Sequence, residues 1–326
     1  MDIRNIQKTG GQSYTVTLPK EWILANSLKN KDRIKIYANK HVLTIAPFSY
    51  KKTSSVPVCH IDNMNKVQIF RELIGYYLSG TDEIIVRAKK ITYEQRAAVR
   101  DLTYRLIGCE CLESMGGQIL IKNTASRDYK NIPDYIHKMM AIILSMFSDT
   151  ATYLKSHDRS LARDVIERDV EVDRLNLGIV RSIHIRRYEI EAADSSTFSI
   201  EDAAYYEHIA VRLERMADHI VRIADYYLLM DKKTQIELGK REKEYVKQTL
   251  AHLFLCEKII YSLEKKKAHD FLDKFMEFNQ RKLEKKLPNR GIMDIVTSES
   301  ISRINGYIAN IAEETINYRN VKSIAG

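Results

Sequence analysis

A helical stretch occurs twice in the second half of this chain, and only the first copy keeps a full set of carboxylates. Residues 162–175 read ARDVIERDVEVDRL and residues 268–281 read AHDFLDKFMEFNQR, and the two align without a gap. A second pair, residues 212–225 (RLERMADHIVRIAD) and the segment from Ile301 (ISRINGYIANIAE), aligns on its own offset. The chain therefore contains an internal repeat, and each copy should fold as a similar structural unit.

The two copies differ most clearly at four acidic positions. Paired in the order first copy then second, these positions hold Asp169 and Phe275, Asp173 and Asn279, Glu214 and Ser302, and Asp218 and Gly306. Four carboxylates are therefore missing together from the second copy. We infer that they act together in the first copy, and that the helical scaffold tolerates their replacement.

The repeat also indicates how the second half of the chain is organised. From Pro133 to Asn320 the sequence reads as helical, with breaks near residues 156–158, 192–197, 231–234, 265–268 and 288–291. These breaks separate six helices, which the repeat divides into three plus three. We therefore predict an all-α domain over residues 130–326, built from two antiparallel three-helix bundles at about 130–232 and 235–322.

Two smaller regions precede the helices in this multidomain α+β chain, whose 326 residues are too many for one compact core. Residues 60–125 read as helix, strand, helix and hairpin, which together form a small α/β module. The module has no glycine-rich phosphate loop of the GxxxxGK or GxGxxG type, which favours a scaffold role. Before it, Ser49–Cys59 reads as a polar linker.

Residues 1–50 read as short strands around one helix, with few apolar side chains for their length. The main apolar positions are Val16, Leu18, Trp22, Ile34 and Ile36. A domain of this size with so small a core needs a further surface to bury. We therefore expect these side chains to be shared between two chains, which would make the protein a homodimer.

The positive charge of the chain is concentrated in its first residues. The net charge is +9, and residues 1–52 hold ten Lys or Arg against three Asp or Glu, a net +7. A small basic domain on a near-neutral body is typical of nucleic-acid binding, although solvated lysines on a strand-rich domain give the same count. If this domain binds double-stranded DNA, Arg4, Lys8 and Lys20 are the expected phosphate contacts.

The segment that begins at Ile6, IQKTGGQSYTVTLPKEWILANSLKNKDRIKIY, resembles the N-terminal swapped-hairpin domain of the AbrB/SpoVT family. The resemblance covers about residues 3–47. It implies that two chains intertwine into one β-barrel. In that family some members bind DNA through basic residues on the barrel, while others use the barrel for dimerisation or for partner binding.

The four acidic residues form two pairs, Asp169 with Asp173 and Glu214 with Asp218, and each pair has the i, i+4 spacing that stacks two carboxylates on one helix face. Stacked anions repel by a few tenths of a kcal/mol, and a bound cation would offset that repulsion. The alternative is a solvated face whose acids pair with nearby arginines, namely Arg168, Arg174, Arg215 and Arg222. Two pairs on neighbouring helices, lost together from the second copy, favour a metal site for iron, manganese, magnesium or zinc.

The segments RDVEVDRL and RLERMADHIVRIAD look like the paired signatures of the PhoU family, and the resemblance covers roughly residues 130–321. It implies two three-helix bundles with E/D-xxx-D motifs that bind metal clusters. The matching positions in this chain are Asp169, Asp173, Glu214 and Asp218, and the second copy lacks the carboxylates for an equivalent cluster. The resemblance further implies regulation of phosphate uptake, through contacts with the cytoplasmic ATPase subunit of the phosphate transporter or with other regulators. The joined arrangement of domains resembles archaeal phosphate-uptake regulators.

An enzyme is the least expected function. Carboxylate-bridged di-iron enzymes need two Glu-x-x-His motifs, and the helical half of the chain has none. The sequence also shows no recognisable pair of nucleophile and base. Because no apolar span or signal core is found, we expect a cytoplasmic protein. Two functions remain, a metal-binding regulator of phosphate uptake and a DNA-binding transcription regulator with a PhoU-like sensor domain.

Overall fold

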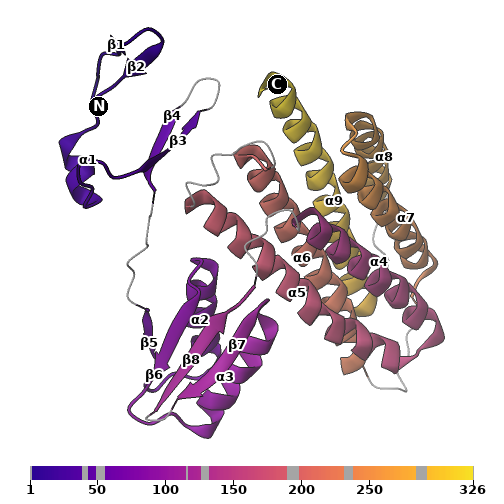
Figure 1. The fold of residues 1–326 in the computed structure, drawn as a ribbon. Helices are drawn as coiled ribbons and strands as arrows, with labels where there is room; N and C mark the ends of the chain where they lie inside the picture. The colour runs from indigo at the N-terminus through magenta and orange to yellow at the C-terminus, as the bar shows by residue number, and fades with distance from the viewer. Residues whose placement is uncertain are drawn as a thin grey trace. The chain divides into compact units, whose positions relative to one another are not determined.

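The computed structural model describes most of the chain, which Figure 1 draws as a ribbon. The described residues are 2–38, 43–48, 56–114, 117–125, 132–188, 198–230, 238–283 and 292–325. They divide into two compact units, one on each side of residue 55. The predicted order of N-terminal strands, mixed sheet and helical region is confirmed. The helix breaks predicted near residues 192–197, 231–234 and 288–291 lie outside the described residues.

The first unit contains two β-hairpins and one short helix. Its elements are β1 (Gln7–Thr9), β2 (Ser13–Thr15), α1 (Lys20–Ala25), β3 (Ile34–Ala38) and β4 (Leu43–Pro47). β1 pairs with β2 and β3 pairs with β4, and both pairs are antiparallel. In the turn between β1 and β2, Gly10 has a φ of 69°, a left-handed backbone that glycine adopts without strain.

This unit buries almost nothing by itself. Ala46 and Pro47 are its only buried residues among those described, and α1 has none. Its exposed large apolar side chains are Ile3, Ile6, Tyr14, Val16, Leu24, Ile36, Leu43 and Phe48. Leu18, Trp22 and Ile34 are half-buried. So much exposed apolar surface is not expected of a monomeric domain. That two chains share these side chains stays a prediction.

The second unit begins with a four-stranded mixed sheet and two helices. The elements are β5 (Val58–His60), α2 (Lys66–Leu78), β6 (Glu83–Arg87), α3 (Tyr93–Arg105), β7 (Cys109–Ser114) and β8 (Gln118–Asn123). The strand order is β5-β6-β8-β7, with β5 parallel to β6 and the other neighbours antiparallel. β5 is a correction, because it lies in the stretch interpreted as a linker. A three-residue strand is too short to show the alternation that reveals a strand in a sequence.

Both helices of this module begin with a capping box. In each box two residues three apart exchange hydrogen bonds, the side chain of each accepting from the backbone N–H of the other. Asn65 and Gln68 form the box of α2, while Thr92 and Gln95 form that of α3. The apolar faces of the two helices cover one face of the sheet. The core between them is made by Ile69, Leu73, Ile84, Val86, Val99, Leu102, Ile119 and Ile121 among others.

Six helices follow the sheet in the described part of the chain. They are α4 (Ile132–Ser156), α5 (Arg159–Tyr188), α6 (Ile200–Leu229), α7 (Lys240–Ser262), α8 (Lys265–Leu283) and α9 (Ile292–Ala325). α5 and α6 pack on each other and on α4, while α8 and α7 pack on each other and on α9. The two sets share one apolar core. None of the described helices is both long enough and apolar enough to cross a membrane.

The contacts between the two sets follow the internal repeat. α6 packs along α9 and α4 packs against α7, so that corresponding helices of the two copies meet each other, as an approximate twofold requires. The turns are also alike. His157 between α4 and α5, and Leu263 between α7 and α8, both have a positive φ, of 60° and 52°. These two residues align at the same offset as the first repeated segment, so the repeat extends to the turn.

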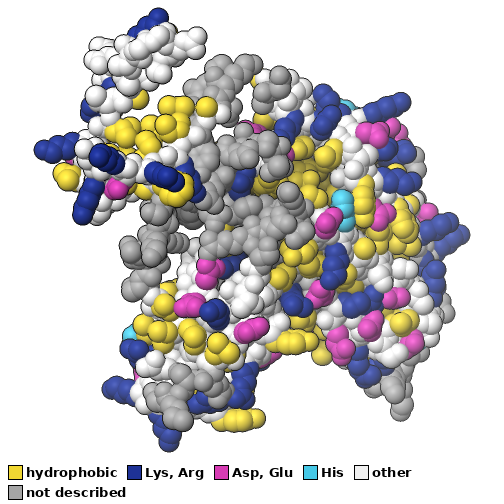
Figure 2. Space-filling model, in the orientation of Figure 1, with side chains coloured by type: hydrophobic (Ala, Val, Ile, Leu, Met, Phe, Trp, Pro, Cys, Tyr) yellow, Lys and Arg dark blue, Asp and Glu magenta, His cyan; other side chains and the backbone are white. Residues whose placement is uncertain are grey.

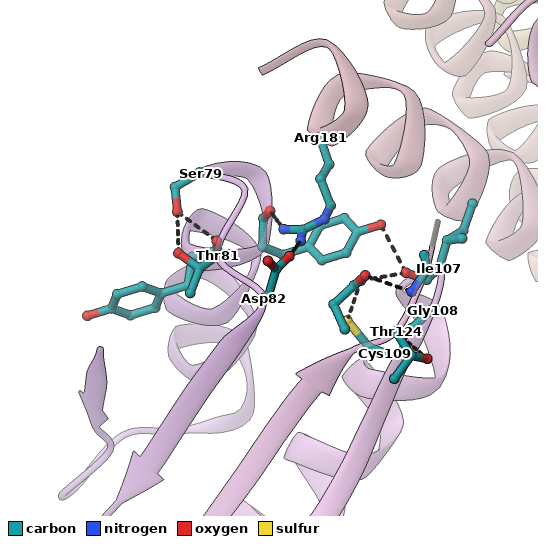
Figure 3. A network of polar contacts seen from close by, with 12 residues as sticks. Ser79, Thr81, Asp82, Ile107, Gly108, Cys109, Thr124 and Arg181 are labelled. Carbon is teal, nitrogen blue, oxygen red and sulfur yellow. Dashed lines mark hydrogen bonds and ion pairs between the residues drawn. The ribbon is translucent and has the colours of Figure 1, made fainter. Parts of the chain in front are cut away.

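The sheet module is fastened to α5 through Arg181, as Figure 3 shows. Arg181 is 5% exposed, and its guanidinium donates hydrogen bonds to the carbonyl oxygen of Tyr77 and, at 2.9 Å, to Oδ1 of Asp82. The same guanidinium lies over the Tyr77 ring, 4.8 Å from its centroid. Gly178, one turn earlier, leaves room for Ile107, since a Cβ at Gly178 would lie 2.6 Å from that side chain. These contacts hold the helix against the module.

Candidate functional site

The four predicted carboxylates lie on two helices that pack side by side. Asp169 and Asp173 are one turn apart on α5, and Glu214 and Asp218 are one turn apart on α6. All four side chains are half-buried. Apolar side chains next to them in the sequence are fully buried and fix which face each helix presents to the core; they are Val172, Leu175, Leu213 and Ala217. The structure therefore places the acidic pairs beside the contact between α5 and α6.

The charges of these residues show that the two pairs face each other. The pKa of Asp169 is raised from 3.8 to about 7, most by burial and then by the nearby charges of Asp173, Asp218, Glu214 and Asp225, in that order. Burial, and then Asp218, likewise raise the pKa of Glu214 from 4.5 to about 7. The pKa of Asp173 is raised by burial and by Asp218. Asp169, Asp173 and Glu214 therefore hold their protons to a higher pH than isolated carboxyl groups would.

The predicted alternative, in which arginines neutralise these acids, holds for one pair only. Arg215 lies 3.5 Å from Glu214 and 3.2 Å from Asp218. The other three arginines pair elsewhere, Arg168 with Asp149 and Asp164, Arg174 with Glu171, and Arg222 with Glu299. No ion pair to Asp169 or Asp173 is found within the described ranges. The pair on α5 is therefore the less compensated of the two.

The donor set suits a hard cation. The Oδ1 atom of Asp169 is buried and has no hydrogen-bond partner, although buried polar atoms normally have one. Carboxylate oxygens are preferred ligands of magnesium and manganese and also bind iron and zinc. Within the part of the chain that the structure describes, no three His, Cys, Asp or Glu side chains already stand in a group that could hold one ion. The metal site thus stays a prediction, and forming it requires these like-charged groups to move closer together.

The second copy of the repeat has a different surface at the corresponding place. Phe275 packs against the shared core and stacks on Phe271, with 5.9 Å between ring centroids. Ser302 is half-buried, and a Cβ added to Gly306 would meet nothing within 4 Å. The side chain of Asn279 lies outside the described residues. At one of the four positions, an aromatic side chain packed on the core therefore stands where the first copy has the half-buried carboxylate of Asp169.

The three residues predicted to contact DNA differ in their surroundings. Arg4 is already engaged, because its guanidinium lies 2.6 Å from Asp2 and donates a hydrogen bond of 3.0 Å to Oγ1 of Thr17. Lys8 is exposed on β1, opposite Tyr14, and Lys20 is exposed as the first residue of α1. Lys8 and Lys20 are therefore the better placed of the three for contacts with phosphate groups.

The sequence interpretation missed one residue that acts on the acidic cluster. The positive charge of Arg105, the last residue of α3, lowers the pKa of Asp173 and so opposes the effect of burial. Arg105 also lies 3.2 Å from Asp101 of its own helix. Residues so far apart in the sequence follow no spacing rule, so only the packing of α3 on α5 reveals the link.

Comparison with known families gives two matches. Residues 136–227 match the family model described as PhoU domain. This region runs from α4 to α6 and includes all four carboxylates. Residues 7–54 match the model described as antidote-toxin recognition MazE, bacterial antitoxin. No curated protein matches the chain. The matches confirm the PhoU resemblance for residues 136–227 and the resemblance of the N-terminal domain for residues 7–54. The PhoU resemblance of the second copy, beyond residue 227, stays a prediction.

Proposed function

Because the chain carries a PhoU domain and a MazE/AbrB-like N-terminal domain, we propose that it regulates phosphate uptake and phosphate homeostasis in the cytoplasm, through protein contacts rather than by catalysis. The observation that carries this proposal is that the PhoU match contains the whole acidic cluster. A regulator of this kind needs a site whose bound metal or protonation can change, and a surface to which a partner protein binds. The cluster provides the first of these.

In this proposal Asp169, Asp173, Glu214 and Asp218 together hold iron, manganese, magnesium or zinc. Such a cation would supply to the α5 pair the kind of ion pair that Arg215 gives to the α6 pair. Asp169 and Glu214 would release their retained protons on binding, because a cation favours the ionised form of a carboxyl group. Arg105 and Arg215 would limit how much positive charge the site accepts.

The proposed partners are the cytoplasmic ATPase subunit of the phosphate transporter or other regulators of phosphate uptake. The test is to capture the tagged full-length chain from native extracts of cells grown with low and with high phosphate. We expect the transporter ATPase subunit to be enriched, to an extent that depends on phosphate. The Asp169→Asn/Asp173→Asn variant should lose this dependence, and the matched control Asp270→Asn/Asp273→Asn, in the second copy, should keep it. Enrichment of the ATPase subunit that changes neither with phosphate nor with the Asp169→Asn/Asp173→Asn substitutions would contradict the proposal.

A DNA-binding transcription regulator is the second candidate, favoured by the net charge of +7 in residues 1–52 and by the MazE match. In this case Lys8 and Lys20, with Arg4, contact phosphate groups of double-stranded DNA, and the PhoU domain serves as the sensor. The two functions are compatible within one chain. Recovery of promoter fragments, in place of transporter subunits, from the same extracts would favour the second.

A further inference from the structure

The sheet of the α/β module has apolar side chains on both of its faces. β6 contains three consecutive apolar residues, Ile84-Ile85-Val86, and β8 contains Ile119-Leu120-Ile121. Such runs are typical of strands that are buried on both sides, because neighbouring side chains point to opposite faces. Ile84, Val86, Ile119 and Ile121 are buried under the helices. Ile85 and Leu120 therefore point to the other face.

On that other face the strand register sets four apolar side chains in one row. Across the sheet the row consists of Val58 on β5, Ile85 on β6, Leu120 on β8 and Leu112 on β7. The first three are half-buried, and Leu112 is 45% exposed. Figure 1 shows α2 and α3 on the far side of the sheet, and Figure 2 shows apolar side chains gathered on the near side. A contiguous apolar patch of this kind marks an interaction surface.

The row has opposite charges on its two sides. On one side the register aligns Glu83, Lys122 and Glu110, with 3.1 Å between Lys122 and Glu83, so this side keeps one net negative charge. On the other side it aligns His60, Arg87 and Gln118, which leaves a positive charge. A patch with an apolar centre, one negative side and one positive side is complementary to a rotated copy of itself.

We propose that this sheet face binds the same face of a second copy of the chain, around a twofold axis that runs along the apolar row. Such an axis places each row residue opposite its own copy, and it places Arg87 of one chain opposite Glu83 of the other. An axis parallel to the strands would instead set Glu83 and Glu110 against the negative side of the second copy, which is unfavourable. The charges therefore select one of the two symmetric arrangements, and the two sheets then pack face to face.

Cross-linking of the full-length chain tests this arrangement. Leu112→Cys should be joined between chains by a short bis-maleimide, because Leu112 lies opposite its own copy. The matched control is Tyr104→Cys on α3, which is 81% exposed but lies on the helical side of the module. Wild type gives the background, since Cys59 and Cys256 are buried and Cys109 and Cys111 are half-buried. We expect a strong covalent dimer for Leu112→Cys only.

Charge reversal in the Leu112→Cys chain identifies the orientation. Arg87→Glu or Glu83→Arg alone creates two like-charge contacts in a symmetric pair and should lower the cross-link yield roughly tenfold. The double reversal should restore it. Circular dichroism checks that each variant is folded. If a charge reversal unfolds the chain, Arg87→Gln is used in its place, and we expect it to lower the cross-link yield by a smaller factor. Equal yields at positions 112 and 104, or a yield that ignores the charge changes, would exclude a second copy here and leave the face to another protein.

Discussion

Arg181 of α5 and Asp82, just before β6, form an ion pair of 2.9 Å although 99 residues separate them in the sequence. With the carbonyl of Tyr77, this pair supplies the guanidinium with hydrogen-bond acceptors. His184, one turn further along α5, lies 3.0 Å from the carbonyl oxygen of Leu78, so polar contacts from two side chains of α5 hold the sheet module at this joint.

Replacing Arg181 by alanine should loosen that joint. The change removes the buried guanidinium but leaves Asp82 able to reach water, so we expect local stability to fall by about 2 kcal/mol. The measurement is amide hydrogen exchange in β6 and at the end of α2, which should become faster. Arg163→Ala, an exposed position on the same helix, is the control and should leave exchange in these elements unchanged. Equal protection in both variants would assign the joint to the apolar contacts.

Removing the charges of the acidic cluster should abolish metal binding without unfolding the chain. The variant combines Asp169→Asn, Asp173→Asn, Glu214→Gln and Asp218→Asn. We expect its metal-free form to be at least as stable as wild type, because the repulsion among the carboxylates disappears and the second copy folds without them. Elemental analysis after dialysis against each metal measures the loss. Metal content equal to that of wild type would refute the assignment.

The stability of the metal-free protein should fall as the pH rises from about 4 to about 7. In that interval the unfolded chain has already released protons that Asp169 and Glu214, with pKa values of about 7, still hold in the folded chain. The penalty is absent below the ordinary pKa values and complete above about 7. Thermal unfolding with a chelator at pH 5.5 and pH 8 should show a higher melting temperature at pH 5.5. Asp169→Asn/Glu214→Gln should shrink this difference, and an unchanged difference would assign it to other groups.

Deleting residues 1–50 should weaken the association between chains. The exposed apolar side chains of the first unit, Val16 and Ile36 among them, would be shared in a dimer, and their removal leaves only weaker contacts. Light scattering during dilution should show the truncated chain dissociating at a higher concentration than wild type. Identical dilution curves would show that the rest of the chain holds the oligomer together.

If the N-terminal domain binds DNA, Lys8→Ala and Lys20→Ala should each lower the logarithmic salt dependence of binding by roughly one unit. Arg4→Ala should have a smaller effect, because Arg4 is already paired with Asp2 and Thr17. Titration of duplex DNA at two salt concentrations measures the slopes. Absence of binding at low salt would leave the domain a purely architectural role.

Helix periodicity and the repeat were enough to predict the six helices and to bring the four carboxylates onto neighbouring helices. These features depend on local spacing, which the sequence displays directly. β5 escaped prediction because three residues show no period. The contacts of Arg105 and Arg181 could not be predicted, because they depend on how distant segments of the chain pack. The sequence separation between Arg181 and Tyr77 follows no rule that indicates a contact.

α5 runs without a break from Arg159 to Tyr188, so its two ends move as one rod. Asp169 and Asp173 lie in its first half, and Arg181, fastened to the sheet module, lies in its second. Eight residues of helix, a rise of about 12 Å, separate Asp173 from Arg181. A small rotation of α5 at the acidic cluster would therefore also move Arg181 and the sheet module that it holds. The charged residues on either side of the apolar row would move with the sheet.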